Sequence, residues 1–273
     1  GGGVYGTDTR LALIDCHFEG NHTAGSGGAV FLESDLSHPS GDHPDPPLVL
    51  RCTFVANTAL SGGGLSLGSS IDGLVVEDST FTGNHASNDG GGLYLAAPAE
   101  VRDCFVAGNR AEARGGGMSL TANYGPVSVR GCTLRGNQAG QAAGGLHVFG
   151  VGGSLADSIL WENVADDPLA AQEIFLNGSW STVELSVSHS DVAGGQAGVD
   201  LGTHGVLDWG AGNLDTDPFF VSASITDPAI DPLSPCREAA APSRSPTVFD
   251  EDLDGQARRY GSAVDMGADE VHP

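Results

Sequence analysis

The residues with the clearest capacity for chemistry are three aspartates near the end of the chain. Asp250, Asp252 and Asp254 alternate with other residues and are followed by Gly255, which matches the first half of a calcium-binding loop. The twelfth position of such a loop would be Gly261, where calcium requires a bidentate glutamate. We therefore expect these carboxylates to pair with Arg258 or Arg259, with a bound calcium ion as the alternative. No other cofactor is indicated.

A second candidate metal site lies in the polar stretch from Glu33 to Pro47. Asp42, His43 and Asp45 are residue types that bind transition metals. Imidazoles in a proline-rich stretch are more often solvated. Solvation is therefore the favoured interpretation.

Four of the five cysteines recur at one position of an internal repeat, namely Cys16, Cys52, Cys104 and Cys132, and Ser79 and Ser158 occupy the same position in other repeats. Disulfides between neighbouring repeats are allowed by a Cα separation of about 4.4–6.8 Å. Side chains stacked in one direction, however, do not readily adopt the required dihedral angle of about 90°. We favour reduced thiols that act as small buried hydrophobes. No histidine recurs at a fixed offset from a cysteine, so the pattern indicates no nucleophile.

The internal repeat is the element that positions these residues. Each unit carries Cys or Ser, an apolar residue two positions later, and an asparagine five positions after the Cys or Ser. Glycines and a short apolar strand follow each asparagine. Successive strands begin 25 to 35 residues apart, a period typical of stacked repeat proteins. The asparagines are Asn21, Asn57, Asn84, Asn109, Asn137 and Asn163.

Short alternating runs identify the type of repeat. Leu93-Tyr94-Leu95 and Val127-Ser128-Val129 are typical of strands, and no long helical periodicity is present. Three strands and three turns fill one unit, which predicts an all-β, right-handed parallel β-helix of about seven rungs. We expect the cysteines to stack as one buried column. The asparagines should adopt the left-handed backbone conformation and form a ladder of amide hydrogen bonds.

The repeat fades after residue 200, which divides the chain into β-helix rungs over residues 1–200 and a C-terminal capping region over residues 201–273. Prolines in the second part exclude long central strands. An open solenoid end is an unpaired strand edge that promotes aggregation. We therefore expect the tail to fold over that end, anchored by Trp180, Trp209, Phe219 and Phe220.

Residues in the middle of the glycine-flanked strands should point outward, because side chains alternate along a strand. This predicted outward column is Tyr5, Phe31, Ser66, Tyr94, Ser119, His147 and Phe175. Exposed rings on a flat sheet can stack on sugars or contact a protein. The alternative is that strands favour aromatic residues anyway and that loops cover the rings. The candidate ligand-binding residues are Tyr5, Phe31, Tyr94, His147 and Phe175.

The repeat resembles a known group of proteins. Phe18-Glu19-Gly20-Asn21 and Gly27-Gly28-Ala29-Val30 are similar to the repeats of polymorphic outer-membrane proteins and other bacterial surface proteins with a parallel β-helix. The tail resembles secreted β-helix proteins of the choice-of-anchor Q type; the matching pieces are 190–195, 213–219, 227–231, 252–255 and 264–270. The resemblance implies the β-helix fold and a cell-surface context. Those families share no catalytic site, so it implies no reaction.

The enzymatic alternative is a polysaccharide lyase or hydrolase with its site in the cap or in upstream rungs missing from this chain. Lyases that resemble pectate or alginate lyases neutralise a uronate with Lys or Arg beside calcium-binding acids. This chain has no lysine. The arginines of the regular rungs are expected to lie in different columns without converging; they are Arg51, Arg102, Arg114, Arg130 and Arg135. A non-catalytic role in adhesion or as a structural scaffold is therefore the favoured function.

Composition limits the partners. All eleven cationic residues are arginines and the formal net charge is −24, which argues against binding to nucleic acid or an anionic membrane. No apolar run approaches the ~20 residues of a membrane span, so we expect no direct membrane insertion. The chain starts at Gly1 partway through a repeat, which we interpret as a processed or truncated product whose uncapped first rung could self-associate. We expect a secreted or cell-surface protein, on the bacterial outer surface, that binds a glycan or a surface protein.

Overall fold

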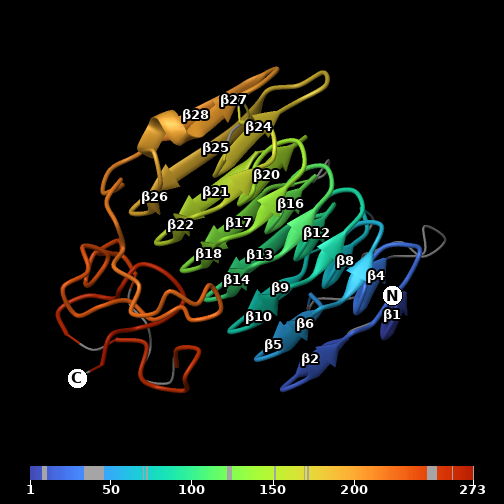
Figure 1. Cartoon of the computed structure of the whole chain (residues 1–273), viewed down its shortest axis with the longest axis horizontal. Helices are drawn as coiled ribbons and strands as arrows, with labels where there is room; N and C mark the ends of the chain where they lie inside the picture. Colours follow the sequence, from blue (N-terminus) through green and yellow to red (C-terminus); the bar gives the residue numbers. More distant parts are fainter. Residues whose placement is uncertain are drawn as a thin grey trace.

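The chain forms a parallel β-solenoid (Figure 1), which confirms the predicted fold class. The structure, a computed structural model, describes residues 1–7, 11–33, 46–69, 71, 73–121, 125–150, 152–168, 170, 172–244, 251–259 and 261–272. Each full winding adds one strand to each of four sheets, named A, B, C and D in the order in which the chain visits them. Parallel pairing of successive windings is what the repeat period predicts.

Sheets A and B each contain eight strands. Sheet A consists of β1 (Val4–Thr7), β4 (Val30–Glu33), β8 (Leu65–Leu67), β12 (Leu93–Leu95), β16 (Met118–Leu120), β20 (Leu146–Phe149), β24 (Ile174–Asn177) and β27 (Val199–Leu201). Sheet B consists of β2 (Ala12–Ile14), β5 (Leu48–Leu50), β9 (Val75–Glu77), β13 (Ala99–Arg102), β17 (Val127–Arg130), β21 (Gly153–Ala156), β25 (Val183–Ser188) and β28 (Gly205–Trp209).

Sheets C and D contain seven and five shorter strands. Sheet C consists of β3 (His17–Glu19), β6 (Thr53–Val55), β10 (Thr80–Thr82), β14 (Phe105–Ala107), β18 (Thr133–Arg135), β22 (Ile159–Trp161) and β26 (Asp191–Val192). Sheet D consists of β7 (Thr58–Ala59), β11 (His85–Ala86), β15 (Arg110–Ala111), β19 (Gln138–Ala139) and β23 (Val164–Ala165). These two-residue strands follow the asparagines and are too short to show alternation, so the sequence indicated three strands per unit where the structure has four.

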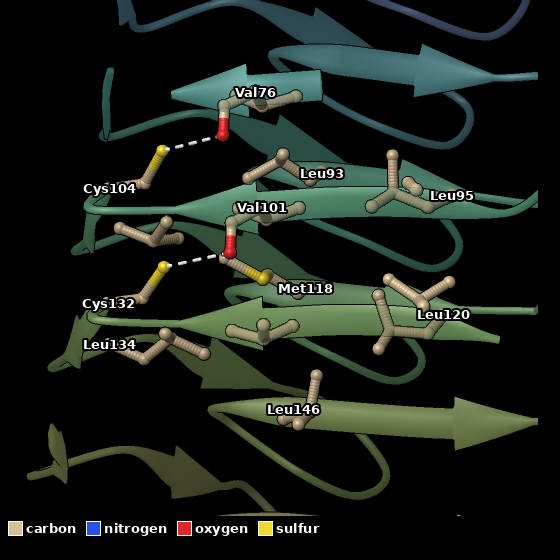
Figure 2. Packing of buried hydrophobic residues seen from close by; sticks show 14 of the residues in the cluster. Val76, Leu93, Leu95, Val101, Cys104, Met118, Leu120, Cys132, Leu134 and Leu146 are labelled. Carbon is tan, nitrogen blue, oxygen red and sulfur yellow. Dashed lines mark hydrogen bonds between the residues drawn. The ribbon is translucent and has the colours of Figure 1, made fainter. Parts of the chain in front are cut away.

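The core runs along the solenoid axis as columns of like residues (Figure 2). Leu93 pairs in register with Leu65 on one side and Met118 on the other, as the repeat alignment predicts. The rings of Phe54 and Phe81 stack with centroids 4.4 Å apart. Stacked windings therefore bury one continuous apolar core.

The sharp corners use left-handed backbone at a position other than the predicted one. The asparagines do not have positive φ; the residue before each of them does, as at Ala56 with φ 53° and Gly83 with φ 64°. A second corner has its left-handed residue before each Cys or Ser, as at Asp78 and Asp103. The expectation of left-handed asparagines is therefore wrong. The turn occurs one residue earlier, so that the buried asparagine side chain can reach the next winding.

The tail does not close the solenoid end as expected; it packs along the outer face of sheet C (Figure 1). Ile159 of β22 packs with Ile230, Cys236 and Met266 of the tail. The physical reason is visible in β14 and β22, whose outward residues are apolar as well as their inward ones. The solenoid itself continues to the end of β28, beyond residue 200.

Two of the four predicted tail anchors are wrong. Trp180 is 97% exposed and Phe219 is 47% exposed. Trp209 and Phe220 are partly buried and pack against apolar clusters. Arg135 on sheet C places its guanidinium 3.9 Å from the Phe220 ring centroid, which fixes this part of the tail to the sheet. Among the described residues, no helix is long and apolar enough to cross a membrane.

Candidate functional site

The asparagines form a buried ladder. The backbone N–H and the Nδ2 of Asn57 both donate to Oδ1 of Asn84, at 3.0 and 2.9 Å. The same pair of bonds joins Asn21 to Asn57, Asn84 to Asn109, Asn109 to Asn137 and Asn137 to Asn163. Each link runs in the same direction, so the ladder has a donor end.

Glu173 terminates the donor end of this ladder. Its Oε1 accepts from the backbone N–H of Asn163 at 3.2 Å and its Oε2 from Asn163 Nδ2 at 2.6 Å. Burial raises the pKa of the Glu173 carboxyl to about 8, against the opposing effect of these two hydrogen bonds. Glu173 was not predicted from the repeat. Its only signal is a glutamate directly before the apolar strand β24, where the other repeats have glycine or, at Ala29, alanine.

The cysteine column is a set of free, buried thiols with Cys16 partly exposed at its end. The Sγ of Cys104 and Cys132 point to the carbonyl oxygens of Val76 and Val101 on the preceding windings, at 3.7 and 3.6 Å (Figure 2). Where serine replaces cysteine, its hydroxyl accepts a backbone N–H, as in the 3.0 Å bond from Cys52 N to Ser79. The column is a structural element of the core.

The outward column is continuous in register but largely covered. Tyr5 is 57% exposed, while Phe31, Tyr94 and Phe175 are partly buried. His147 is only 1% exposed, so its predicted exposure is wrong. The cause is the glycine turn before each strand: a Cβ at Gly90, with φ 71°, would lie 3.0 Å from the Tyr94 Cβ. These turns fold back over the outer face of sheet A.

His147 is part of a buried hydrogen-bonded row. Its Nδ1 lies 3.0 Å from the Ser119 hydroxyl and its Nε2 lies 2.9 Å from Asn177 Oδ1. Its ring stacks on Phe175 with centroids 5.7 Å apart. Burial lowers the pKa of His147 to about 4, which keeps the imidazole neutral at physiological pH. The residue supports the sheet and is not available to a ligand in this structure.

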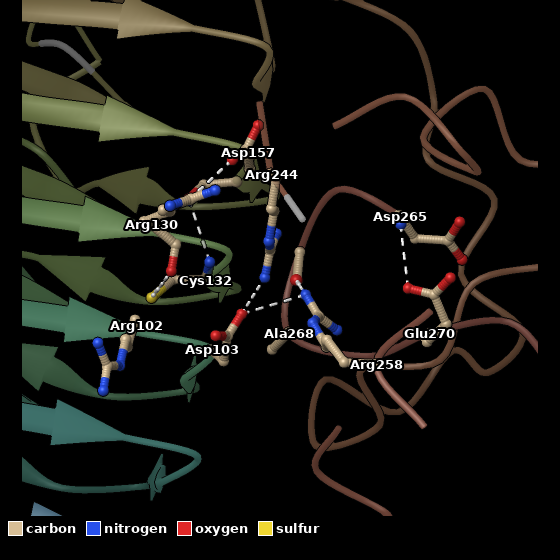
Figure 3. A network of polar contacts seen from close by, with 12 residues as sticks. Arg102, Asp103, Arg130, Cys132, Asp157, Arg244, Arg258, Asp265, Ala268 and Glu270 are labelled. Atoms are coloured by element: carbon tan, nitrogen blue, oxygen red, sulfur yellow. Dashed lines mark hydrogen bonds and ion pairs between the residues drawn. The ribbon is translucent and has the colours of Figure 1, made fainter. Parts of the chain in front are cut away.

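A polar groove lies where the ends of sheet B strands meet the tail (Figure 3). We call it the flank groove; its cavity volume is about 700 Å³. Its charged lining residues are Arg51, Glu77, Asp78, Glu100, Arg102, Asp103, Arg130, Arg244, Glu251, Asp252, Asp254 and Arg258. Five of the eleven arginines thus converge here.

The expectation that the rung arginines are scattered is therefore wrong for three of them. Arg102 and Arg130 are register partners on β13 and β17. Arg51 lies at the left-handed corner directly after β5. The tail supplies Arg244 and Arg258, which could not be placed from the repeat because they lie outside it. Arg114 and Arg135 lie elsewhere, paired with Asp89 and Glu162.

Residues of the left-handed corner carry charges in the flank groove and beside it; Asp78 and Asp103 line the groove itself. Asp15 pairs with Arg51 at 2.7 Å, and Asp103 pairs with both Arg244 and Arg258 (Figure 3). Asp157 pairs with Arg130 at 3.0 Å. Asp78 makes no side-chain hydrogen bond or ion pair with any described residue. Burial, followed by the charges of Asp103 and Glu77, raises the pKa of its carboxyl to about 7.

The predicted calcium residues are only partly described. Asp250 lies outside the described residues, as do Asp42, His43 and Asp45. Asp252 is buried and its Oδ1 accepts the backbone N–H groups of Asp254 and Gln256, at 3.1 and 2.8 Å. The expected ion pairs with Arg258 or Arg259 are wrong for the described aspartates, because Arg258 pairs with Asp103 and Arg259 bonds to Ser262 O. The described part of the chain holds no group of three metal-binding side chains.

Fold and columns together define the class of this chain: a parallel β-solenoid repeat protein. A family model, the Chlamydia polymorphic membrane protein repeat, matches residues 15–33 and 78–96. Both segments contain a corner residue, an asparagine of the ladder and the glycine turn before sheet A. Repeats of this type indicate a surface-exposed repeat protein. No curated protein and no solved structure shows significant similarity to the chain. The similarity of the tail to choice-of-anchor Q proteins stays a prediction.

Proposed function

We propose that the protein is a non-catalytic, secreted or cell-surface β-solenoid that acts in adhesion, binding a glycan or a surface protein. The observation that carries the proposal is the aromatic pair that Tyr5 and Phe31 form on the outer face of sheet A. Tyr5 is 57% exposed and its ring lies 5.7 Å from that of Phe31 in a tilted contact. Further along the column, the turns cover Ser66, Ser119 and His147.

The Tyr5–Phe31 pair has the character of an adhesive contact. The Tyr5 hydroxyl donates to the Glu33 carboxylate, so apolar ring faces lie beside a hydrogen-bonding acceptor. Such a surface suits the apolar face and hydroxyl edge of a sugar, or an aromatic protein contact. Each ring is expected to contribute about tenfold in affinity.

The test is a binding screen of the full chain against a glycan array and a panel of purified surface proteins. Tyr5→Ala with Phe31→Ala should lower the affinity for any ligand found by about 100-fold. Val164→Ala is the matched control, because it too truncates an exposed apolar side chain; Val164 is 44% exposed and lies on sheet D. Tyr5→Ala alone guards against loss of folding, because its ring is the more exposed. Unchanged binding in Tyr5→Ala and in the folded double variant would contradict the proposal.

A further inference from the structure

The end of the solenoid at β28 is a surface that the described residues of the tail leave open. β27 and β28 are the last strands of sheets A and B, and each pairs with a single described strand (Figure 1). The tail leaves this end and packs along sheet C. Leu201 of β27 and Val206 of β28 are 46% and 44% exposed. Stacked repeat proteins need a cover at such an end to stay soluble.

The two end strands direct backbone groups to the open side. The N–H of Gly202 donates to Leu176 O on β24 at 2.9 Å. Because backbone groups alternate between the two sides of a strand, the N–H and C=O of Leu201 face away from β24. On β28 the equivalent bond from Gly210 places the N–H and C=O of Trp209 on the open side. Strand edges of this kind are templates for pairing with another strand.

An occupant of this end has two edges to satisfy at once. Sheets A and B face each other across the apolar core, so the edges of β27 and β28 lie on opposite sides of one end face. A single extended peptide pairs with one of them only. A second copy of this chain presents the same two edges at the same separation. A two-fold axis through the end face places β28 antiparallel to its copy and β27 beside its own, which closes both edges.

The size of the end face sets the strength of such a contact. A strand of five residues, such as β28, is about 17 Å long, and facing sheets lie about 10 Å apart. With the outward side chains included, two end faces in contact bury about 800–1,000 Å² in total. This area is near the lower limit of about 1,000 Å² for a specific interface, which corresponds to a weak dimer with a Kd of about 10–100 µM.

Two carboxylates oppose this contact. Asp200 and Asp208 are exposed on the two end strands, and the two-fold axis brings like charges together. The net charge of −24 adds repulsion at longer range. Salt screens both effects, so the association strengthens as the ionic strength rises. The same charges protect the open edge from indiscriminate pairing with other strands.

We propose that the chain forms a two-fold dimer through this end of the solenoid, in which β28 pairs antiparallel with the β28 of a second copy. Tyr5 and Phe31 lie on β1 and β4, at the opposite end of sheet A, and stay free in the dimer. The dimer thus carries two such aromatic pairs, one at each far end. The dimer itself does not depend on the adhesion proposal.

The experiment is sedimentation equilibrium of the full chain from about 5 µM to about 1 mM, in about 0.05 M and about 0.5 M sodium chloride. We expect a reversible step from the mass of one chain to that of two, with an association constant at least about threefold higher in the higher salt. Val206→Asp should weaken the dimer about tenfold or more, because it adds a like charge to the end face. Val164→Asp is the matched control, since Val164 is also 44% exposed and lies on sheet D.

A second variant and a local readout keep the test decisive if circular dichroism shows that Val206→Asp does not fold. Leu201→Pro removes an N–H that faces the open side and no hydrogen bond within sheet A, so it should also weaken the dimer. Amide exchange at Leu201 in the unmodified chain should slow as the protein concentration rises, because the dimer buries this edge.

Three outcomes would overturn the proposal. The first is a monomer at about 1 mM in both salt concentrations. The second is equal weakening by Val206→Asp and Val164→Asp, which would place the contact elsewhere. The third is growth beyond the dimer, which would mean head-to-tail stacking of two different ends. None of these variants touches Tyr5 or Phe31, so failure of the dimer leaves the test of adhesion unaffected.

Discussion

Replacing Asn109 with alanine should unfold the solenoid more easily than any single change at its surface. Asn109 lies in the middle of the ladder and is 1% exposed. Its side chain accepts from Asn84 N and Asn84 Nδ2, both at 2.9 Å, and donates to Phe81 O and Asn137 Oδ1, at 2.9 and 3.0 Å. Asn109→Ala leaves two buried N–H groups of Asn84 without an acceptor.

The magnitude follows from those two donors. An unsatisfied buried donor costs about 1–3 kcal/mol, so we expect a loss of about 2–6 kcal/mol in the free energy of unfolding. Asn21→Ala is the matched control at the half-buried end of the ladder. There the Asn57 Oδ1 keeps the backbone N–H of Asn21 as donor, and the expected cost is about 1 kcal/mol or less.

The assay is urea unfolding followed by circular dichroism, with amide hydrogen exchange at Asn84 as a local readout. Exchange at Asn84 should accelerate in Asn109→Ala and stay slow in Asn21→Ala. Repeat proteins can lose two-state behaviour, so the local readout decides if the unfolding transition broadens. Equal effects of the two substitutions would refute the claim that buried amide bonds stabilise the stack.

Three further predictions concern groups buried in the windings. His147 has a pKa of about 4 in the fold against 6.5 in the unfolded chain, so its contribution to stability is present above about pH 6.5 and is lost as the pH falls towards 4. The loss is about 3 kcal/mol, and His147→Gln should remove this pH dependence from acid unfolding curves. Glu173 behaves in the opposite sense: its pKa is about 8 in the fold against 4.5 in the unfolded chain, so its contribution to stability is present below about pH 4.5 and is lost as the pH rises through 8, by up to about 5 kcal/mol. A difference in unfolding free energy between wild type and Glu173→Gln that stays flat over pH 5–9 would contradict this. Cys104→Ser should change the melting temperature little, with a cost of about 1 kcal/mol or less, because Ser79 already occupies the same column one winding earlier; a large drop would mean that the column depends on sulfur packing.

The repeat made the fold predictable because the same physical requirement recurs in every winding. Phe54 and Phe81, or Leu65 and Leu93, occupy equivalent sequence positions and become register partners. The ladder follows from the same periodicity, since parallel stacking places equivalent residues beside each other at about 4.8 Å. What the period does not encode is the residue that ends the asparagine ladder, and Glu173 is that residue.

The flank groove lay outside the reach of the sequence for a related reason. Asp78 and Asp103 belong to the repeat, but Arg244 and Arg258 come from a tail whose path is not periodic. The outward apolar residue Phe105 beside inward Val106 was the available signal that something covers sheet C. His147 shows the converse limit, because alternation predicts which way a side chain points and not which turn covers it.

The most direct test of the adhesion account is photo-crosslinking from the outward column. A photo-reactive phenylalanine at position 5, in place of Tyr5, would be exposed to the natural surface from which the protein is recovered or to which it adheres. The same residue at position 164, in place of the exposed Val164 on sheet D, is the control. If the outward column is adhesive, position 5 gives a discrete crosslinked partner and position 164 gives none. Adhesion that persists with crosslinks from position 164, or from neither position, would contradict it.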